Sequence, residues 1–348
     1  MPRTSPTGRR VRRSLLAAFA AVAAVAVLLG SGVAAGPAAA VPSPNAPNEG
    51  GSKQLRAALE AAAKGHIEAQ NKLENSKRRQ KALAAQLTDI EGRLVGLSAQ
   101  AGEVAAQSYR MGRLTATSML LASADPNDFL KRAAELDVMA QRDSKRLREL
   151  ADAKAQAAEA KLAIDAEVRE QAKQVAVQAR KKKDAEVALA KVSSGAGSGF
   201  NGTSSSAKPA PRNSDGSWPS ESCSVDDPTP ASGCITPRTL HMLQQAKSAG
   251  YKRYASCHRS GGGGEHPKGR ACDFSAASGG FEDKTATGGD KAYGDSLAAW
   301  AKNNANRLGI MYVIWYRQIW MPNTGWRAYS GGGSPAADHT NHVHISMY

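Results

Sequence analysis

The residues of this chain best suited to chemistry lie in its last hundred positions, since five of its seven histidines follow residue 250. Residues 265–274 contain His266 and Asp273, and residues 338–345 contain His344. Two imidazoles and one carboxylate form a ligand set for a catalytic zinc ion, which takes three protein ligands and keeps a fourth position open for water. The residue types therefore predict a Zn²⁺ site formed by His266, Asp273 and His344.

The spacing of these residues suggests how they could face one ion. Gly269 and its neighbours form a turn between His266 and Asp273, so a loop histidine and a carboxylate at the start of a strand can point at one position. His342 and His344 are two residues apart on a predicted strand and therefore share one face of it. One of them can bind the metal while the other stands beside the substrate.

A small α+β domain with an antiparallel sheet is expected to hold these residues. All five tryptophans lie at or beyond Trp218, so a compact core is expected from that position onward. Thr236 is a suitable N-cap for a helix that opens with Pro237. Without the βαβ alternation of a parallel sheet, the elements favour an α+β fold. The expected helices span 237–250 and 295–308, and the expected strands span 251–255, 310–315, 317–320 and 342–346.

The first forty residues are expected to be a cleaved signal peptide. A segment with five arginines precedes an apolar run from residue 15 to residue 29, and residues 38–40 are alanines, so cleavage is predicted near Ala40. The alternative is a retained membrane anchor, because the uncharged stretch is long enough to span a bilayer. The net charge is +15, and loss of the five arginines leaves +10. This charge suits an anionic cell-wall surface, and no nucleic-acid motif accompanies it.

The four cysteines are predicted to form two disulfides. They follow an export signal, and an even number of cysteines in an oxidising compartment favours disulfide bonds. Of the three possible pairings, Cys223–Cys234 with Cys257–Cys272 is favoured, the second connecting the segment before the first histidine ligand to the strand that carries the carboxylate. A cysteine-rich zinc site is the alternative, but no pair has the short CxxC spacing.

Between the leader and the globular part, the sequence predicts a long antiparallel coiled-coil hairpin. One seam runs from Leu55 to Val104 and a second from Leu147 to Val192, both in steps of four and three residues, which is the period of a coiled coil. Breakers between the seams indicate that the chain turns back through a short helical tip. The expected segments are a signal peptide at 1–40, a linker at 41–52, the hairpin at 53–192, a flexible linker at 193–217 and the peptidase-like domain at 218–348.

Three short motifs near the expected tip, Tyr109-Arg110, Leu120-Leu121 and Asp128-Phe129-Leu130, lie within residues 107–147. With these motifs the hairpin resembles the coiled coils of secreted, division-associated regulators of cell-wall hydrolases. In that family the hairpin docks onto the extracellular part of a membrane complex that is similar to an ABC transporter. The resemblance implies such a partner, and the alternative is a spacer with no specific partner.

Residues 264–273 and 342–344 follow the pattern S-x-H-x-x-G-x-A-x-D with a late H-x-H. In this pattern the domain resembles the zinc D-alanyl-D-alanine peptidases, in the superfamily that includes lysostaphin-type enzymes and hedgehog domains. The resemblance implies that His266, Asp273 and His344 bind zinc and that Arg259 grips a substrate carboxylate. Residues 313–320, 325–326 and 339–346 also resemble the ends of uncharacterised secreted actinobacterial domains.

Two positions depart from the peptidase pattern. The family serine is replaced by Gly264, and the general base that usually precedes the last ligand by three residues is replaced by Asn341, which cannot take a proton. Asp338 and His342 are the candidate catalytic groups instead, with His339 as a further candidate.

Three functions follow from these observations. The first is a secreted zinc peptidase that cuts the stem peptides of peptidoglycan and is positioned by its coiled coil. The second is a non-catalytic protein that binds peptidoglycan or activates a hydrolase, as the asparagine in the base position would suggest. The third is a structural coiled coil with a disulfide-stabilised cap, which would bind no metal.

Overall fold

The computed structural model describes residues 50–112, 115–192, 195–202 and 205–348. The predicted signal peptide and residues 41–49 of the first predicted linker lie outside this part of the chain. Within the described residues, no helix is both long enough and apolar enough to cross a membrane.

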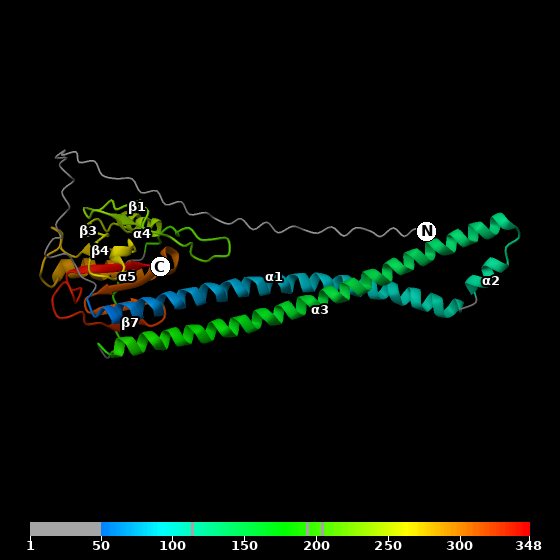
Figure 1. Ribbon diagram of the computed structural model, residues 1–348, viewed down its shortest axis with the longest axis horizontal. Coiled ribbons are helices and arrows are strands. Elements are labelled where there is room, and N and C mark those ends of the chain that lie inside the picture. The colour runs from blue at the N-terminus through cyan, green and yellow to red at the C-terminus, as the bar shows by residue number, and fades with distance from the viewer. Residues whose placement is uncertain (1–49, 113–114, 193–194, 203–204) are drawn as a thin grey trace, which may run out of the picture. The chain divides into compact units, whose positions relative to one another are not determined.

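Two long helices form the predicted antiparallel hairpin (Figure 1). Helix α1 spans Lys53–Met111 and helix α3 spans Pro126–Ala190, with the short helix α2, Thr115–Leu121, between them. The Asp125 side chain accepts hydrogen bonds from two backbone N–H groups at the start of α3 and so caps this helix. Contacts across the pair, from Ser76 to Glu167 and from Arg93 to Gln156, show that the helices run in opposite directions.

The two arms differ in how well the sequence predicts their seam. On α1 the buried residues near the start include Leu55, Leu59 and Ala62, as the heptad predicts. On α3 the predicted layer at Lys154 and Lys161 is wrong by one residue, because Ala153 and Ala160 are buried instead. Alanine lets two helices approach closely without removing an ammonium group from water, so the lysines lie outside the seam.

The C-terminal domain contains a six-stranded antiparallel sheet in the order β3-β4-β8-β5-β6-β7. Its strands are β3 Ala255–Ser256, β4 Ala271–Ser275, β5 Ile310–Trp315, β6 Gln318–Met321, β7 Gly325–Ala328 and β8 His342–Met347. A separate pair joins β1 Val225–Asp226 to β2 Cys234–Ile235. The predicted α+β class with an antiparallel sheet is therefore confirmed.

The two faces of this sheet have different partners. Helices α4, Pro237–Ser248, and α5, Gly288–Leu308, share a buried cluster with Val343 and Ile345 of β8. Side chains on the other face of the sheet, among them Tyr312 and Ile314, share a second cluster with the first turns of α1 and the end of α3. Strand alternation thus gives β8 an apolar side toward α5 and a side with two histidines toward the opposite face.

The structure also differs from the expected element boundaries. Helix α5 begins at Gly288, seven residues before the predicted start. Its first two residues are glycines, and its N-cap Thr287 makes no side-chain capping hydrogen bond, so the sequence carries no strong start signal there. Strand β7 was not predicted. The described parts of residues 195–217, expected to be a flexible linker, contact the domain: the Gly199 N–H donates to Gln318, and the Ala207 N–H donates to Asn304.

Both favoured disulfides are present, Cys223–Cys234 and Cys257–Cys272. No cysteine is left unpaired in the described residues, which contain all four. Two disulfides point to an extracellular or otherwise oxidising environment.

Candidate metal centre

Three different elements bring the predicted ligands together. His266 begins a single 3₁₀ turn, His266–Lys268, that ends at Gly269 in a left-handed conformation. Asp273 lies in the middle of β4, and His344 lies directly opposite it on β8. Residues directly opposite each other in an antiparallel pair place their side chains on the same face. The sheet register therefore makes the Asp273–His344 pair, and the turn after the glycine loop adds the second imidazole.

The ligand atoms converge within hydrogen-bonding distance of one another. His344 Nδ1 is 2.8 Å from Asp273 Oδ1, and His266 Nε2 is 3.1 Å from Asp273 Oδ2. The two imidazole nitrogens are 3.3 Å apart. All three side chains are buried. Two imidazole nitrogens and a carboxylate that converge on one point match the donor set of zinc sites.

The outward nitrogens of the two histidines both have hydrogen-bond partners. His266 Nδ1 contacts the backbone carbonyl of Cys257, which only accepts, so this nitrogen carries the proton. His344 Nε2 is 2.7 Å from the hydroxyl of Ser346, two residues along the same strand. Such outer partners orient metal-binding histidines and raise the basicity of the inner nitrogen. His266 Nε2 is thus set to present a lone pair to a cation, and His344 Nδ1 can do so when its Nε2 donates to the Ser346 hydroxyl.

The charge state of the carboxylate also suits a cation. Burial by itself would raise the pKa of Asp273, but electrostatic interactions with His266 and His342 and hydrogen bonds with His266 and His344 lower this pKa well below its usual value. Asp273 is therefore ionised in the folded chain at neutral pH and can act as an anionic ligand.

Two further histidines lie beside the three ligands. The ring of His339 is 4.6 Å from that of His342 and 5.6 Å from that of His344, measured between centroids. The Nε2 atoms of His339 and His342 are buried and have no hydrogen-bond partner in the described part of the chain. Burial lowers the pKa of His342 to about 4, with Asp273 opposing the shift. His342 is accordingly a neutral base with an unshared nitrogen, 3.6 Å from Asp273 Oδ1.

Asn341 has a defined role next to this base. Its amide nitrogen donates to the Glu282 carbonyl, which turns its oxygen toward His342 Nδ1 at 2.7 Å. His342 therefore donates from Nδ1, and its Nε2 holds the lone pair. The residue that cannot be a base itself orients a neighbour that can.

The remaining predicted site residues lie in two places. Arg259 is near the ligands, with its guanidinium 3.8 Å from Asp273 Oδ2. The carboxylate of Asp338 instead accepts from the backbone N–H groups of Gly331, Gly332 and Gly333 and from the Arg317 guanidinium. Its Oδ1 thus holds the glycine-rich loop, and its Oδ2 pairs with Arg317.

The first turns of α1 contact the segments around the ligands. The Gly51 N–H donates to the Gly331 carbonyl, and Arg56 donates to the Gly262 carbonyl. Glu60 pairs with Lys268 and Arg270, which both also pair with Glu265 beside the first ligand. These contacts, together with the packing of α1 on Tyr312, help explain why the ligand side chains have almost no exposed surface.

Sequence reasoning missed two groups that act on the ligands. Ser346 is one, and the spacing H-x-S on a strand could have shown it, because residues two apart share a face. Tyr312 is the other: its ring stacks on that of His344 with a centroid distance of 5.6 Å and an interplanar angle of 15°. No local pattern could have shown this contact, since it depends on the pairing of β5 with β8.

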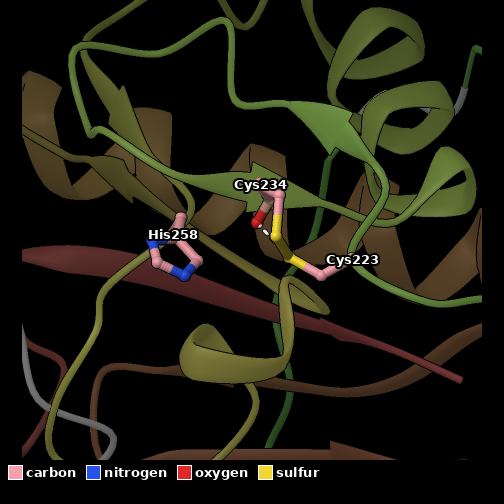
Figure 2. Close-up of side chains that lie close together, drawn as sticks. All are labelled: Cys223, Cys234 and His258. Atoms are coloured by element: carbon pink, nitrogen blue, oxygen red, sulfur yellow. Dashed lines mark hydrogen bonds between the residues drawn. A yellow bond between two sulfur atoms is a disulfide. The ribbon is translucent and has the colours of Figure 1, made fainter. Parts of the chain in front are cut away.

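A second group with ligand-type atoms consists of Cys223, Cys234 and His258 (Figure 2). Figure 2 shows the two sulfurs joined, with the imidazole beside them. A thiolate is the sulfur species that binds metals, and a disulfide offers none. His258 Nδ1 is 2.9 Å from the Ser232 carbonyl. In its oxidised form this group is a cross-link and not a metal site.

Comparisons with known proteins give one similarity. A family model described as "VldE, C-terminal domain" matches residues 231–340. The match contains His266 and Asp273 and ends before His344. No curated protein and no solved structure matches the chain significantly.

Proposed function

We propose that the C-terminal domain is a zinc-dependent peptidase that acts on the stem peptides of peptidoglycan. The observation that carries the proposal is the convergence of two imidazole nitrogens and one carboxylate, with the outer nitrogens of both histidines already occupied. Bound there, zinc would supply Lewis-acid polarisation of a carbonyl and a more acidic water.

The chain's own residues supply the rest of the chemistry. His342 takes a proton at Nε2, because its Nδ1 is committed to Asn341 and its Nε2 is unshared. Arg259 pairs with a carboxylate of the substrate, and a guanidinium suits that task because it binds carboxylates in a two-pronged manner. Asp338 supports the loop at Gly331–Gly333 and so contributes to the shape of the site, not to proton transfer.

The proposal includes the place of action. A signal peptide cleaved near Ala40 would export the chain, consistent with its two disulfides. The tip of the hairpin exposes Tyr109, Leu121 and Leu130, with 90%, 80% and 65% of their surface accessible. An apolar, exposed tip suits docking to the extracellular part of a division-site membrane complex.

A second candidate is a non-catalytic peptidoglycan-binding or hydrolase-activating protein. The observation that favours it is the burial of the ligands, since His266 and His344 are 1% and 0% exposed. A substrate needs access to the metal, whereas a structural zinc site does not.

Two measurements on the full chain without its leader separate these candidates. Metal analysis should find about one zinc per chain, lost in His266→Ala and retained in His342→Ala. Digestion of muropeptides should be abolished in both variants and by a chelator. Zinc binding without any cleavage would select the second candidate, and absence of zinc would reject the zinc-dependent peptidase.

A further inference from the structure

A pocket of about 250 Å³ lies between helix α1 and the C-terminal domain. Helix α1 contributes His66 and Asn71 to its wall, α5 contributes Lys302 and Asn303, and the indoles of Trp218 and Trp320 complete it. None of the candidate metal ligands lines it. The pocket is therefore a second potential binding site, separate from the one described above.

The chemistry of the wall is that of a site for a neutral, hydroxyl-rich ligand. It combines two indoles with four carboxamide side chains and contains no carboxylate. Carboxamides both donate and accept hydrogen bonds, and an indole offers a flat apolar face. Lys302 is the one lysine or arginine in the wall, too few for a polyanionic ligand such as a nucleic acid, whose affinity comes from many phosphate contacts.

Parts of this wall are held in place before any ligand binds. The Arg212 guanidinium lies 3.5 Å from the centre of the Trp218 ring, which fixes that indole as a floor. The same guanidinium donates to the Asn71 side chain and to the backbone and side chain of Asn306. Trp320 is only partly buried. A fixed floor with one partly exposed indole suits a ring with an apolar C–H face that enters from one side.

One polar atom of the wall has no partner. His66 Nδ1 is buried, and within the described residues it makes no hydrogen bond. Burial lowers the pKa of His66, with a hydrogen bond from its ring to the Gln178 backbone opposing the shift, so the ring is neutral. A buried polar atom without a partner is destabilising, and a ligand N–H or O–H that reached it would remove that penalty.

We propose that this pocket binds an N-acetylated amino sugar of a β-1,4-linked glycan strand. The pyranose ring packs on Trp320, the acetamido N–H donates to His66 Nδ1, and the hydroxyls pair with the carboxamides. The volume lies below the range of about 300–1,000 Å³ of pockets for drug-sized ligands, which fits one or two sugar rings. The choice of glycan rests on the proposed action at peptidoglycan, while the binding itself does not require the metal site.

The test is calorimetric titration of the full chain with chitotetraose, with tryptophan fluorescence as a second signal. We expect saturable binding that is at least about tenfold weaker in Trp320→Ala, since an aromatic stacking contact is worth about that much. Because Trp320 also packs on the core, Asn303→Phe provides a second variant: it fills the pocket from an exposed position and should also weaken binding at least tenfold. Arg307→Phe places the same ring on an exposed position of α5 outside the pocket and should bind as the unmodified chain does.

Other probes separate this inference from the proposed peptidase. His266→Ala should bind chitotetraose normally, even though it loses zinc. Cellotetraose, which lacks the acetamido groups, should bind more weakly than chitotetraose. Absence of saturable chitotetraose binding, equal binding of cellotetraose, or unchanged binding in Asn303→Phe would overturn the proposal, whatever the zinc content.

Discussion

Replacing Ser346 by alanine should weaken zinc binding without unfolding the domain. The hydroxyl lies 2.7 Å from His344 Nε2 and is the partner that orients this imidazole, so that its Nδ1 faces the point shared by the three candidate ligands. Loss of such an outer partner typically costs about 10- to 100-fold in metal affinity, or about 1.4–2.7 kcal/mol. The metal-free chain should lose only about 1 kcal/mol of unfolding free energy, the usual contribution of one hydrogen bond.

The sheet offers a matched control at Ser275. This serine is as fully buried as Ser346 and lies on the neighbouring strand β4. Its hydroxyl donates to the carbonyls of Ala277 and Gly280 and contacts no candidate ligand. Ser275→Ala should therefore cost a similar amount of stability and leave the zinc affinity unchanged.

Zinc affinity is best measured by competition with a chromophoric chelator, and stability by urea unfolding of the metal-free chains. Both variants should unfold at a lower urea concentration than the unmodified chain, and only Ser346→Ala should lose zinc to a weaker competitor. If Ser346→Ala kept its zinc affinity within about twofold, or Ser275→Ala lost as much, the argument that outer hydrogen bonds set the ligand nitrogens would be refuted.

Three further predictions concern stability. Burial would raise the pKa of Asp338, but hydrogen bonds from Gly331, Gly333 and Arg317 outweigh burial and lower this pKa. The stability that the carboxylate contributes is present above the unfolded pKa of about 4 and is lost as the pH falls through the folded pKa. Asp338→Asn should therefore flatten the acid side of a plot of the urea midpoint against pH. The double variant Cys257→Ser/Cys272→Ser should lose about 3 kcal/mol of unfolding free energy, measured by chemical unfolding, as expected for a 15-residue loop. A reductant should then lower the stability of this variant less than it lowers that of the unmodified chain. Ala153→Gln should lower the melting temperature measured by circular dichroism, with a loss of about 1–3 kcal/mol of stability, whereas Lys154→Gln should not. If Lys154→Gln lowered the melting temperature more than Ala153→Gln, the seam predicted from the sequence would be correct after all.

The candidate site was largely predictable because its signals are local. The turn at Gly269 and the seven-residue spacing of His266 and Asp273 lie in one short stretch, and the two histidines of β8 share a face by strand alternation. The disulfide pairing was predictable for a related reason: each favoured bond joins cysteines close in sequence, 11 and 15 residues apart.

Features that depend on pairing between distant elements could not be predicted. The seam of α3 illustrates this, because Val168 and Val175 are more apolar than their neighbours and yet are 48% and 54% exposed. Which layer is buried depends on the register against α1, set by contacts such as that of Ser76 with Glu167. The role of Asn341 depends likewise on the Glu282 carbonyl, 59 residues earlier, which fixes the direction of its amide.

The position of β8 in the sheet has a consequence for the order of folding. It follows every other strand in sequence, yet it lies between β4 and β5 and joins the two halves of the sheet. Asp273 on β4, which lies opposite His344 on β8, precedes that histidine by 71 residues. Pairing of β4 with β8 is therefore slow, because the loop between these residues must close first. We therefore expect the sheet to remain in two open halves until β8 inserts, and the candidate metal centre to be completed in that same late step.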